Sequence, residues 1–192
     1  MEQYKIAVSG SSTDNCAQGA FKKAYEVGRQ IALHKCVLIT GATIGVPQWA
    51  TRGAKSAKGV SIGLSPASSR DAHMRTYRLP TNFMDLIIYT GFDYSGRNML
   101  MTRASDAVII VCGRIGTLNE FTTAFEDKRV VGILTGTGGI EEDIPDILKD
   151  AKRGKKFMIF DSDPKLLVEK VIRKIREVRQ KKGVLNRKRE TA

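Results

Sequence analysis

The stretch AVIIVCGRIGTLNE, residues 107–120, joins a continuous apolar run to a glycine-containing turn and the start of a helical pattern. The run from Ala107 to Cys112 is typical of a strand in a parallel sheet that is covered on both faces. The turn after it therefore lies at the carboxyl edge of the sheet, where the free N–H groups of a helix start attract anions. We predict a phosphate site at this turn, with Glu120 one helical turn further on as a candidate acid or base.

Apolar runs and helical patterns alternate along the rest of the chain, which predicts an α/β fold. The class is a three-layer Rossmann-like, doubly wound, mostly parallel sheet with helices on both faces. Strands are expected at residues 4–9, 36–40, 60–64, 85–90, 106–112, 130–134 and 156–160. Helices are expected from near Asp14 to 33, through 49–54, over 96–104, after 117, over 144–152 and from 164 onward. The long polar connection over 65–82 is typical of a lid, a binding loop or a disordered segment.

A chain of 192 residues with 42% hydrophobic residues is long enough to bury one sizeable core. We expect a nucleotide-binding Rossmann-like domain over residues 1–163. Residues 164–192 are expected to form an amphipathic helix and a basic tail packed on the same domain. The spacing of Leu167, Val171, Ile175 and Val178 predicts the buried face of that helix.

The net charge of +12 is concentrated near the carboxyl end. Residues 1–150 contain 17 Lys and Arg against 15 Asp and Glu, a net of +2, whereas residues 151–192 contain 15 against 5, a net of +10. This charge includes the basic pair Lys181-Lys182 and the basic triplet at 187–189. They form either a solvated helix end or a contact for nucleic acid. No stretch is long and apolar enough for a membrane span and no signal-peptide pattern is present, so we expect a cytoplasmic protein without membrane contact.

Three cysteines lie far apart in the sequence, at Cys16, Cys36 and Cys112. Their number and spacing fit a reducing compartment and buried or half-buried thiols, to which we assign no chemistry. His34 and His73 are isolated, and no spacing typical of a metal site is present. We expect no metal and no redox cofactor.

Three glycine-containing turns, after the first, second and fifth expected strands, should meet at one edge of the sheet. They begin at Gly10, Gly41 and Gly113. None has the Gly-x-Gly-x-x-Gly spacing of dinucleotide enzymes. A mononucleotide or a phosphorylated sugar is therefore a better candidate ligand than NAD.

Several of these segments together resemble the LONELY GUY-type phosphoribohydrolases, a superfamily once misannotated as lysine decarboxylases. The segments are IAVSGSS (6–12), LITGA (38–42), RN (97–98), SDA (105–107) and GRIGTLNE (113–120). Within the superfamily, the chain most resembles an uncharacterised bacterial branch related to DNA-processing protein A. The family signature is Pro-Gly-Gly-x-Gly-Thr-x-x-Glu, preceded by an Arg-Lys pair. Here Cys112 replaces the proline, Arg114 replaces the middle glycine and Asn98 replaces the lysine, while the arginine and the glutamate are retained.

The resemblance implies hydrolysis of the N-glycosidic bond of a nucleoside 5′-monophosphate to free base and ribose 5-phosphate. Its catalytic residues would be Arg97 and Glu120. Glu120 would stabilise an oxocarbenium-like transition state or activate water, and Arg97 would anchor the substrate or hold Glu120. Arg114 would either contact the phosphate or block its site. The nucleotide- and phosphate-binding residues would be Gly10, Ser11, Gly41, Asn98, Gly113, Arg114, Gly116 and Thr117. Relatives of this fold form homodimers, and the resemblance implies the same here.

Simpler roles exist for the same residues. Glu120, as a carboxylate in the first turn of a helix, could simply stabilise the helix through its dipole. Arg97 could pair with a nearby carboxylate in a purely structural ion pair. The alternative function is therefore a non-catalytic nucleotide sensor, or a nucleic-acid-binding module akin to DNA-processing protein A.

Overall fold

The computed structural model describes residues 3–13, 16–152 and 154–190, with side chains described up to Lys181. Over these residues a seven-stranded sheet has the order β4-β3-β2-β1-β5-β6-β7, and every strand pair is parallel. The strands are β1 (Lys5–Gly10), β2 (Val37–Thr40), β3 (Ser61–Ser65), β4 (Leu86–Tyr89), β5 (Ala107–Val111), β6 (Val130–Leu134) and β7 (Met158–Asp161). The predicted doubly wound α/β class is confirmed.

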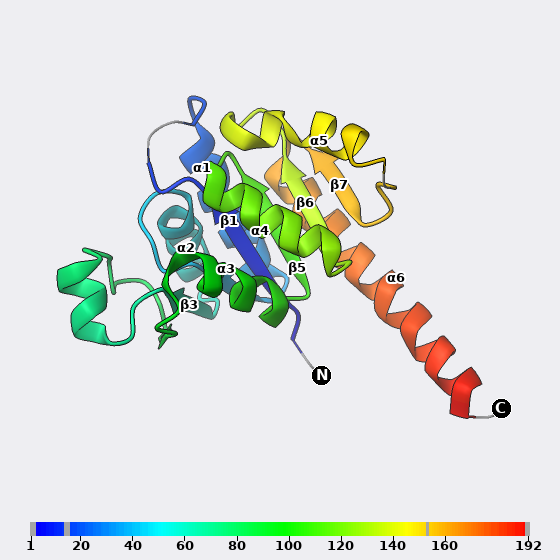
Figure 1. Cartoon of the computed structure of the whole chain (residues 1–192), viewed down its shortest axis with the longest axis horizontal. Coiled ribbons are helices and arrows are strands. Elements are labelled where there is room, and N and C mark those ends of the chain that lie inside the picture. The colour runs from blue at the N-terminus through cyan, green and yellow to red at the C-terminus, as the bar shows by residue number, and fades with distance from the viewer. Residues whose placement is uncertain (1–2, 14–15, 153, 191–192) are drawn as a thin grey trace.

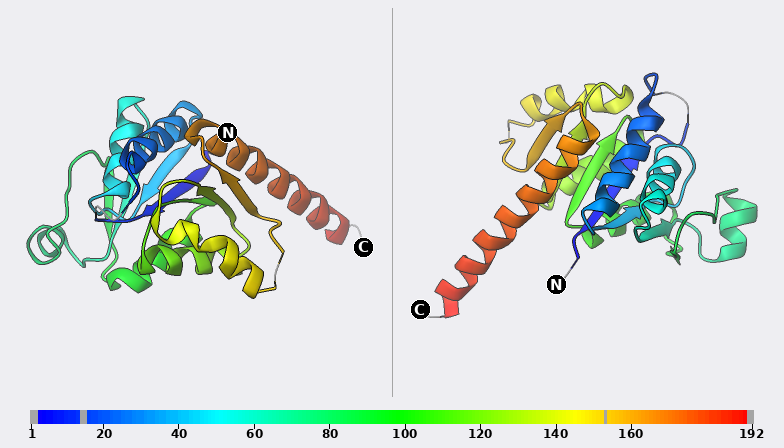
Figure 2. Two further views of the ribbon diagram at one scale, coloured as in Figure 1. Left: turned by 90° about the horizontal axis from the view of Figure 1, so that it is seen from above. Right: turned by 180° about the vertical axis from the view of Figure 1, so that it is seen from behind.

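Helices cover both faces of the sheet, which gives three layers (Figures 1 and 2). One face is covered by α1 (Ala20–Leu33), α2 (Val46–Ser56) and α6 (Pro164–Glu190). The other is covered by α3 (Asp93–Ala104), α4 (Ile115–Glu126) and α5 (Ile144–Asp150). A short π-helix, η1 (Ala72–Thr76), and a 3₁₀ helix, η2 (Gly139–Glu142), interrupt two of the connections.

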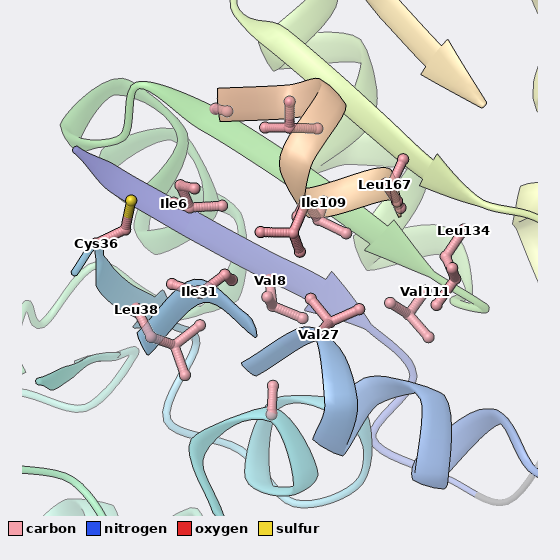
Figure 3. Close-up of a cluster of buried hydrophobic side chains, with 14 of the residues drawn as sticks. Ile6, Val8, Val27, Ile31, Cys36, Leu38, Ile109, Val111, Leu134 and Leu167 are labelled. Carbon is pink, nitrogen blue, oxygen red and sulfur yellow. The ribbon is translucent and has the colours of Figure 1, made fainter. Parts of the chain in front are cut away.

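The side chains of β5 divide between the two faces of the sheet, because side chains alternate along a strand. Ile109 and Val111 pack with α1, α2 and α6, in the cluster of Figure 3. Val108 and Ile110 pack on the opposite side with Phe121 of α4. A strand buried on both faces must be apolar at every position, and all five residues of β5 are buried.

The sheet reverses its direction of growth between β1 and β5. The connections from β1 lead outward through β2, β3 and β4, whereas those from β5 lead the other way through β6 and β7. In open α/β sheets, ligands bind outside the carboxyl ends of the strands at such a reversal. Gly10 is paired in register with Val111, so β1 and β5 end at the same level.

Several element boundaries differ from the predictions: α2 begins at Val46, α3 at Asp93, α4 at Ile115 and β7 at Met158. Two further differences have a clear cause in the backbone. Helix α1 begins at Ala20 rather than near Asp14, because Gly19 has φ +84°, a left-handed conformation that ends helical continuity. Asp14 lies outside the described residues. Strand β5 ends at Val111, because Cys112 has φ +56° and turns the chain out of the sheet.

The long connection over residues 65–82 is anchored by a buried histidine. His73, in η1, is fully buried. Its Nδ1 lies 2.8 Å from Ser65 Oγ and its Nε2 lies 2.9 Å from the carbonyl oxygen of Pro80. These contacts fix the middle of the connection to Ser65, the last residue of β3, and to Pro80 near the end of the connection.

The prediction of free thiols is wrong for two of the three cysteines. Cys16 and Cys112 form a disulfide, with their Cα atoms 5.6 Å apart and a sequence separation of 96 residues. Their partnership arises from the parallel sheet, which brings the loops after β1 and β5 to the same edge. Cys36 is a buried free thiol, and burial raises its pKa to about 11.

Helix α6 confirms the predicted apolar stripe, since Leu167, Val171 and Ile175 are all buried against the sheet. Its carboxyl-terminal half extends away from the domain (Figure 1). The basic side chains of Lys182 and of residues 187–189 lie outside the described side chains. Over the described ranges, no helix combines the length and the apolar character that crossing a bilayer requires. The same ranges hold no cluster of three or more His, Cys, Asp or Glu residues suited to a metal ion.

Helices α1 and α2 approach so closely that a methyl group at Gly53 would lie 1.8 Å from the carbonyl oxygen of Tyr25. At an open helical position, Gly→Ala stabilises a protein by up to about 1 kcal/mol. At Gly53 we expect the opposite, a loss of about 1–3 kcal/mol in the free energy of unfolding, because the helices must separate. Urea denaturation of Gly53→Ala tests this. Gly154→Ala, at an exposed position with open space around it, is the matched control and should be within about 0.5 kcal/mol of the parent.

Candidate active site

A cavity of about 440 Å³ lies at the carboxyl ends of the central strands, where the sheet reverses. The loops after β1 and β2 form one wall, and the first turns of α3 and α4 form the other. Its lining includes nearly all of the predicted site residues: Gly10, Ser11, Gly41, Arg97, Asn98, Arg114, Gly116, Thr117 and Glu120. Gly113 is the exception. It is buried beside the cavity with φ +108°, and a Cβ at this position would lie 2.5 Å from Thr117 Cγ2, so only glycine fits there.

The start of α4 supplies the predicted phosphate-binding donors. The first intrahelical bond runs from the amide of Leu118 to the carbonyl of Arg114, at 2.9 Å. The amides of residues 115–117 precede that bond, and no side chain in the described part of the chain caps the helix. Since Arg114, Ile115, Gly116 and Thr117 all line the cavity, these donors and the positive end of the helix dipole are available to an anion.

A buried ion pair forms the floor of the cavity. Arg97 Nη1 lies 3.4 Å from Glu120 Oε1, and the two side chains are only 6% and 7% exposed. Arg97 comes from α3 and Glu120 from α4, so the packing of these two helices brings the pair together. Within the described residues, Arg97 Nε has no hydrogen-bond partner. It is a buried donor at the cavity floor.

Two further residues hold the Glu120 carboxylate. Ser9, the penultimate residue of β1, donates a hydrogen bond to Glu120 Oε2. One end of the Asn98 amide lies 3.0 Å from Glu120 Oε1 and 2.9 Å from the carbonyl oxygen of Tyr94. We assign the nitrogen to this end because both neighbours are acceptors, so that Asn98 donates to each of them. The residue that replaces the family lysine therefore bonds to the acid instead of adding a charge. Both carboxylate oxygens of Glu120 have partners.

Burial dominates the electrostatics of the pair. Desolvation raises the pKa of Glu120 above its ordinary value, while the charge of Arg97 and the hydrogen bond from Ser9 lower it in opposition. Desolvation likewise lowers the pKa of Arg97, against the charge of Glu120. Each group therefore depends on the other to remain ionised without water.

The comparisons with known proteins agree with this architecture. The model of the SLOG cluster4 family matches residues 3–168. The chain belongs to the SLOG cluster4 family. This match confirms the resemblance to the LONELY GUY-like superfamily that the sequence motifs indicated.

This SLOG cluster4 chain is similar to one further protein in sequence and to two solved structures. An uncharacterized protein of Archaeoglobus fulgidus is 34% identical over 134 residues, which are 69% of this chain and 82% of that protein. The molybdenum cofactor binding protein of Rippkaea orientalis has a TM-score of 0.71 and 28% identity, over 89% of this chain and 96% of its own. DNA processing protein A of Streptococcus pneumoniae has a TM-score of 0.64 and 18% identity, over 84% of this chain and 59% of its own. That last likeness shows the shared fold alone. The family match, with the likeness to the molybdenum cofactor binding protein, supports a nucleotide-related binding fold.

Sequence reasoning about this SLOG cluster4 chain missed several residues of the cavity. The sequence pattern places Ser9 in an apolar strand. Only its position near the carboxyl end of β1 could have indicated that it contacts the site. Tyr94, 49% exposed, lies at the rim with its ring 5.9 Å from the Arg97 guanidinium. Ile115 is 80% exposed on the α4 side of the same cavity. An exposed aromatic and an exposed aliphatic residue at a cavity rim offer surfaces for a ring.

Gly41 is required for the position of Arg97. A methyl group at Gly41 would lie 2.0 Å from Arg97 Nη1. We expect Gly41→Ala to displace the guanidinium from Glu120 and to lower the free energy of unfolding by about 1–3 kcal/mol. Urea denaturation measures the loss. In an Arg97→Met background, the same substitution should cost clearly less, and equal costs in both backgrounds would contradict the contact.

Proposed function

We propose that this chain binds a nucleoside 5′-monophosphate, or a similar phosphorylated heterocycle, in the cavity at the ends of β1 and β5. The observation that carries the proposal is the union in one cavity of the uncapped start of α4 with the buried Arg97–Glu120 pair. The amides of residues 115–117 would bind the phosphate, and exposed Arg114 would add charge at the mouth. Tyr94 and Ile115 would contact the heterocycle.

In the same proposal, Glu120 and Arg97 support hydrolysis of the N-glycosidic bond. The oxygen of a water molecule bonds to the anomeric carbon as the bond from that carbon to the base nitrogen breaks. The electron pair leaves with the base, which takes up a proton, and the attacking water loses one. A carboxylate held near the sugar stabilises the positive charge of this transition state or accepts the proton from water. Ser9, Asn98 and Arg97 would keep Glu120 ionised and oriented for that role.

The experiment is a panel of nucleoside 5′-monophosphates with chromatographic detection of free base. We expect base release by the parent chain, and a loss of at least 100-fold in Glu120→Gln, because the amide lacks the negative charge. Calorimetric binding of the nucleotide should survive in Glu120→Gln. Glu142→Gln, which removes an exposed carboxylate away from the cavity, is the matched control and should retain full activity. Base release that persists in Glu120→Gln contradicts the assignment of Glu120.

Binding without turnover is the second candidate function. It is favoured by the 28% identity with a molybdenum cofactor binding protein over nearly the whole chain, and by Asn98 in place of the family lysine. On this proposal the ligand is carried or sensed, and Glu120 serves to hold Arg97 in place. Incubation with molybdenum cofactor released from a molybdoenzyme, followed by gel filtration and metal analysis, tests it. Co-elution of molybdenum with the chain, together with no base release from any nucleotide, would favour this candidate over the hydrolase.

Nucleic-acid binding is a separate proposal and rests on charge alone. Helix α6 extends away from the domain and exposes Arg173, Arg176 and Lys181. We expect weak retention of single-stranded DNA that falls steeply with salt, and its loss when Arg173, Arg176 and Lys181 are all replaced by Gln. Retention that is independent of salt would contradict a phosphate-backbone contact.

A further inference from the structure

Three loops meet at the edge of the sheet beside the cavity: residues 11–13 and 16–19 after β1, 112–114 after β5 and 135–139 after β6. Thr137 is bonded to both of the other loops. The amide of Ala17 donates to the Thr137 carbonyl at 2.9 Å, and the amide of Cys112 donates to Thr137 Oγ1 at 2.7 Å. The disulfide between Cys16 and Cys112 adds a covalent link between the first two loops.

The loop after β6 is itself firmly held. The amides of Thr137 and Gly138 donate to Oε1 of the buried Glu141, at 2.7 and 3.2 Å. The Thr137 hydroxyl donates to the carbonyl of Leu134 at 2.8 Å. This loop is therefore a fixed support, and loss of the disulfide would be felt mainly in the other two loops.

The Cys112 end of the disulfide continues directly into the cavity wall, since the lining residues 114–117 follow it. Cys112 also has φ +56°, a conformation that residues other than glycine seldom adopt unless their surroundings impose it. The disulfide is part of those surroundings, and such strained positions concentrate at functional sites.

We propose that Cys16 and Cys112 are a redox-active pair: their disulfide ties residues 16–17 to the turn at 112–114 that leads into the cavity wall at 114–117, and a dithiol reductant releases them. The pair lies outside the proposed chemistry of Arg97 and Glu120. Its role as a switch does not depend on which ligand the cavity takes.

The exposure of the two cysteines sets the order of the exchange. Cys16 is half-buried, whereas Cys112 is fully buried, so the reductant thiolate attacks Cys16 Sγ. The bond between the two protein sulfurs breaks, and Cys112 leaves as a thiolate that takes up a proton. The second thiol of the reductant then attacks its own sulfur in the mixed disulfide and releases Cys16 as a thiol. Two electrons and two protons pass to the protein, and the dithiol becomes a disulfide.

Hydrogen exchange of the full chain tests the proposal, with the Ala17 amide as the direct reporter. The chain is oxidised with glutathione disulfide or reduced with dithiothreitol, and its thiols are counted by mass spectrometry after alkylation. In the reduced chain we expect at least tenfold faster exchange in peptides covering 16–20 and 112–118. Peptides covering the centre of β2 open only in global unfolding, so in the reduced chain they should still exchange far more slowly than these two segments. Cys36→Ala, which removes the thiol outside the pair, should respond as the parent does.

Cys16→Ser should exchange rapidly in both conditions and show no response to dithiothreitol. Two results would overturn the proposal: no disulfide after treatment with glutathione disulfide, or a disulfide whose reduction leaves exchange in both segments unchanged. The readout needs no ligand, so failure of the nucleotide assays and failure of this inference are distinguishable.

Discussion

Replacing Arg97 by methionine should lower the free energy of unfolding by about 3–5 kcal/mol at pH 8, because Glu120 would remain buried without its counter-ion. The side chains are nearly isosteric along their stems, so loss of packing contributes little. Urea denaturation gives the value. Arg97→Met combined with Glu120→Gln should recover most of the loss, because the amide carries no charge to desolvate. A loss below about 1 kcal/mol in the single variant would contradict a buried ion pair.

The same variant should show a characteristic pH dependence. Burial already raises the pKa of Glu120 above its ordinary value of 4.5, and removal of Arg97 removes the main influence that lowers it. A group with a raised folded-state pKa favours the folded state below its unfolded pKa, and that contribution is lost as the pH rises through the folded pKa. The deficit of Arg97→Met relative to the parent should therefore be small near pH 4 and grow toward neutral pH. A deficit that is constant over this range would contradict protonation of Glu120 as its cause.

Reduction of the Cys16–Cys112 disulfide should lower the free energy of unfolding by about 4–5 kcal/mol, which chain entropy gives for a loop of nearly 100 residues. The disulfide restricts the unfolded chain, since it ties together positions that are 96 residues apart. Guanidinium denaturation with and without dithiothreitol measures the difference.

The control variants make this prediction specific. Cys16→Ser should unfold like the reduced parent and should not respond to dithiothreitol. Cys36→Ala should respond fully, apart from a cavity cost that is equal in both conditions. If the oxidised and reduced parent unfold at the same denaturant concentration, the disulfide does not contribute to stability in solution.

The parts of the fold that could be predicted are those set by local pattern. The run from Ala107 to Val111 is apolar at every position because both of its faces are covered, and that pattern is legible without a structure. The helical spacing of Leu167, Val171 and Ile175 predicted the one face of α6 that packs on the sheet. The boundary at Ala20 was missed because it depends on the conformation of Gly19, which the helical spacing of neighbouring residues does not report.

The candidate site was predictable as far as strand ends could be located. Gly10, Gly41 and the turn after β5 converge because parallel strands share one carboxyl edge. The hydrogen bond from Ser9 to Glu120 depends on how α4 packs over β1, which no short-range pattern contains. The disulfide could not be predicted either, because two cysteines 96 residues apart form no local sequence pattern.

The reversal of strand order between β1 and β5 means that the cavity belongs to neither half of the sheet. The turns after β1 and β2 come from one half, and Glu120 with the start of α4 comes from the other. A fragment that ends before β5 would keep Arg97 but lack Glu120 and the start of α4. Any ligand of this cavity thus binds the docked halves and not their separated forms, and at 100 times its dissociation constant it adds about 2.7 kcal/mol to the folded state. Ligand supply would then set the lifetime of the protein against proteolysis, and scarcity would lower its abundance.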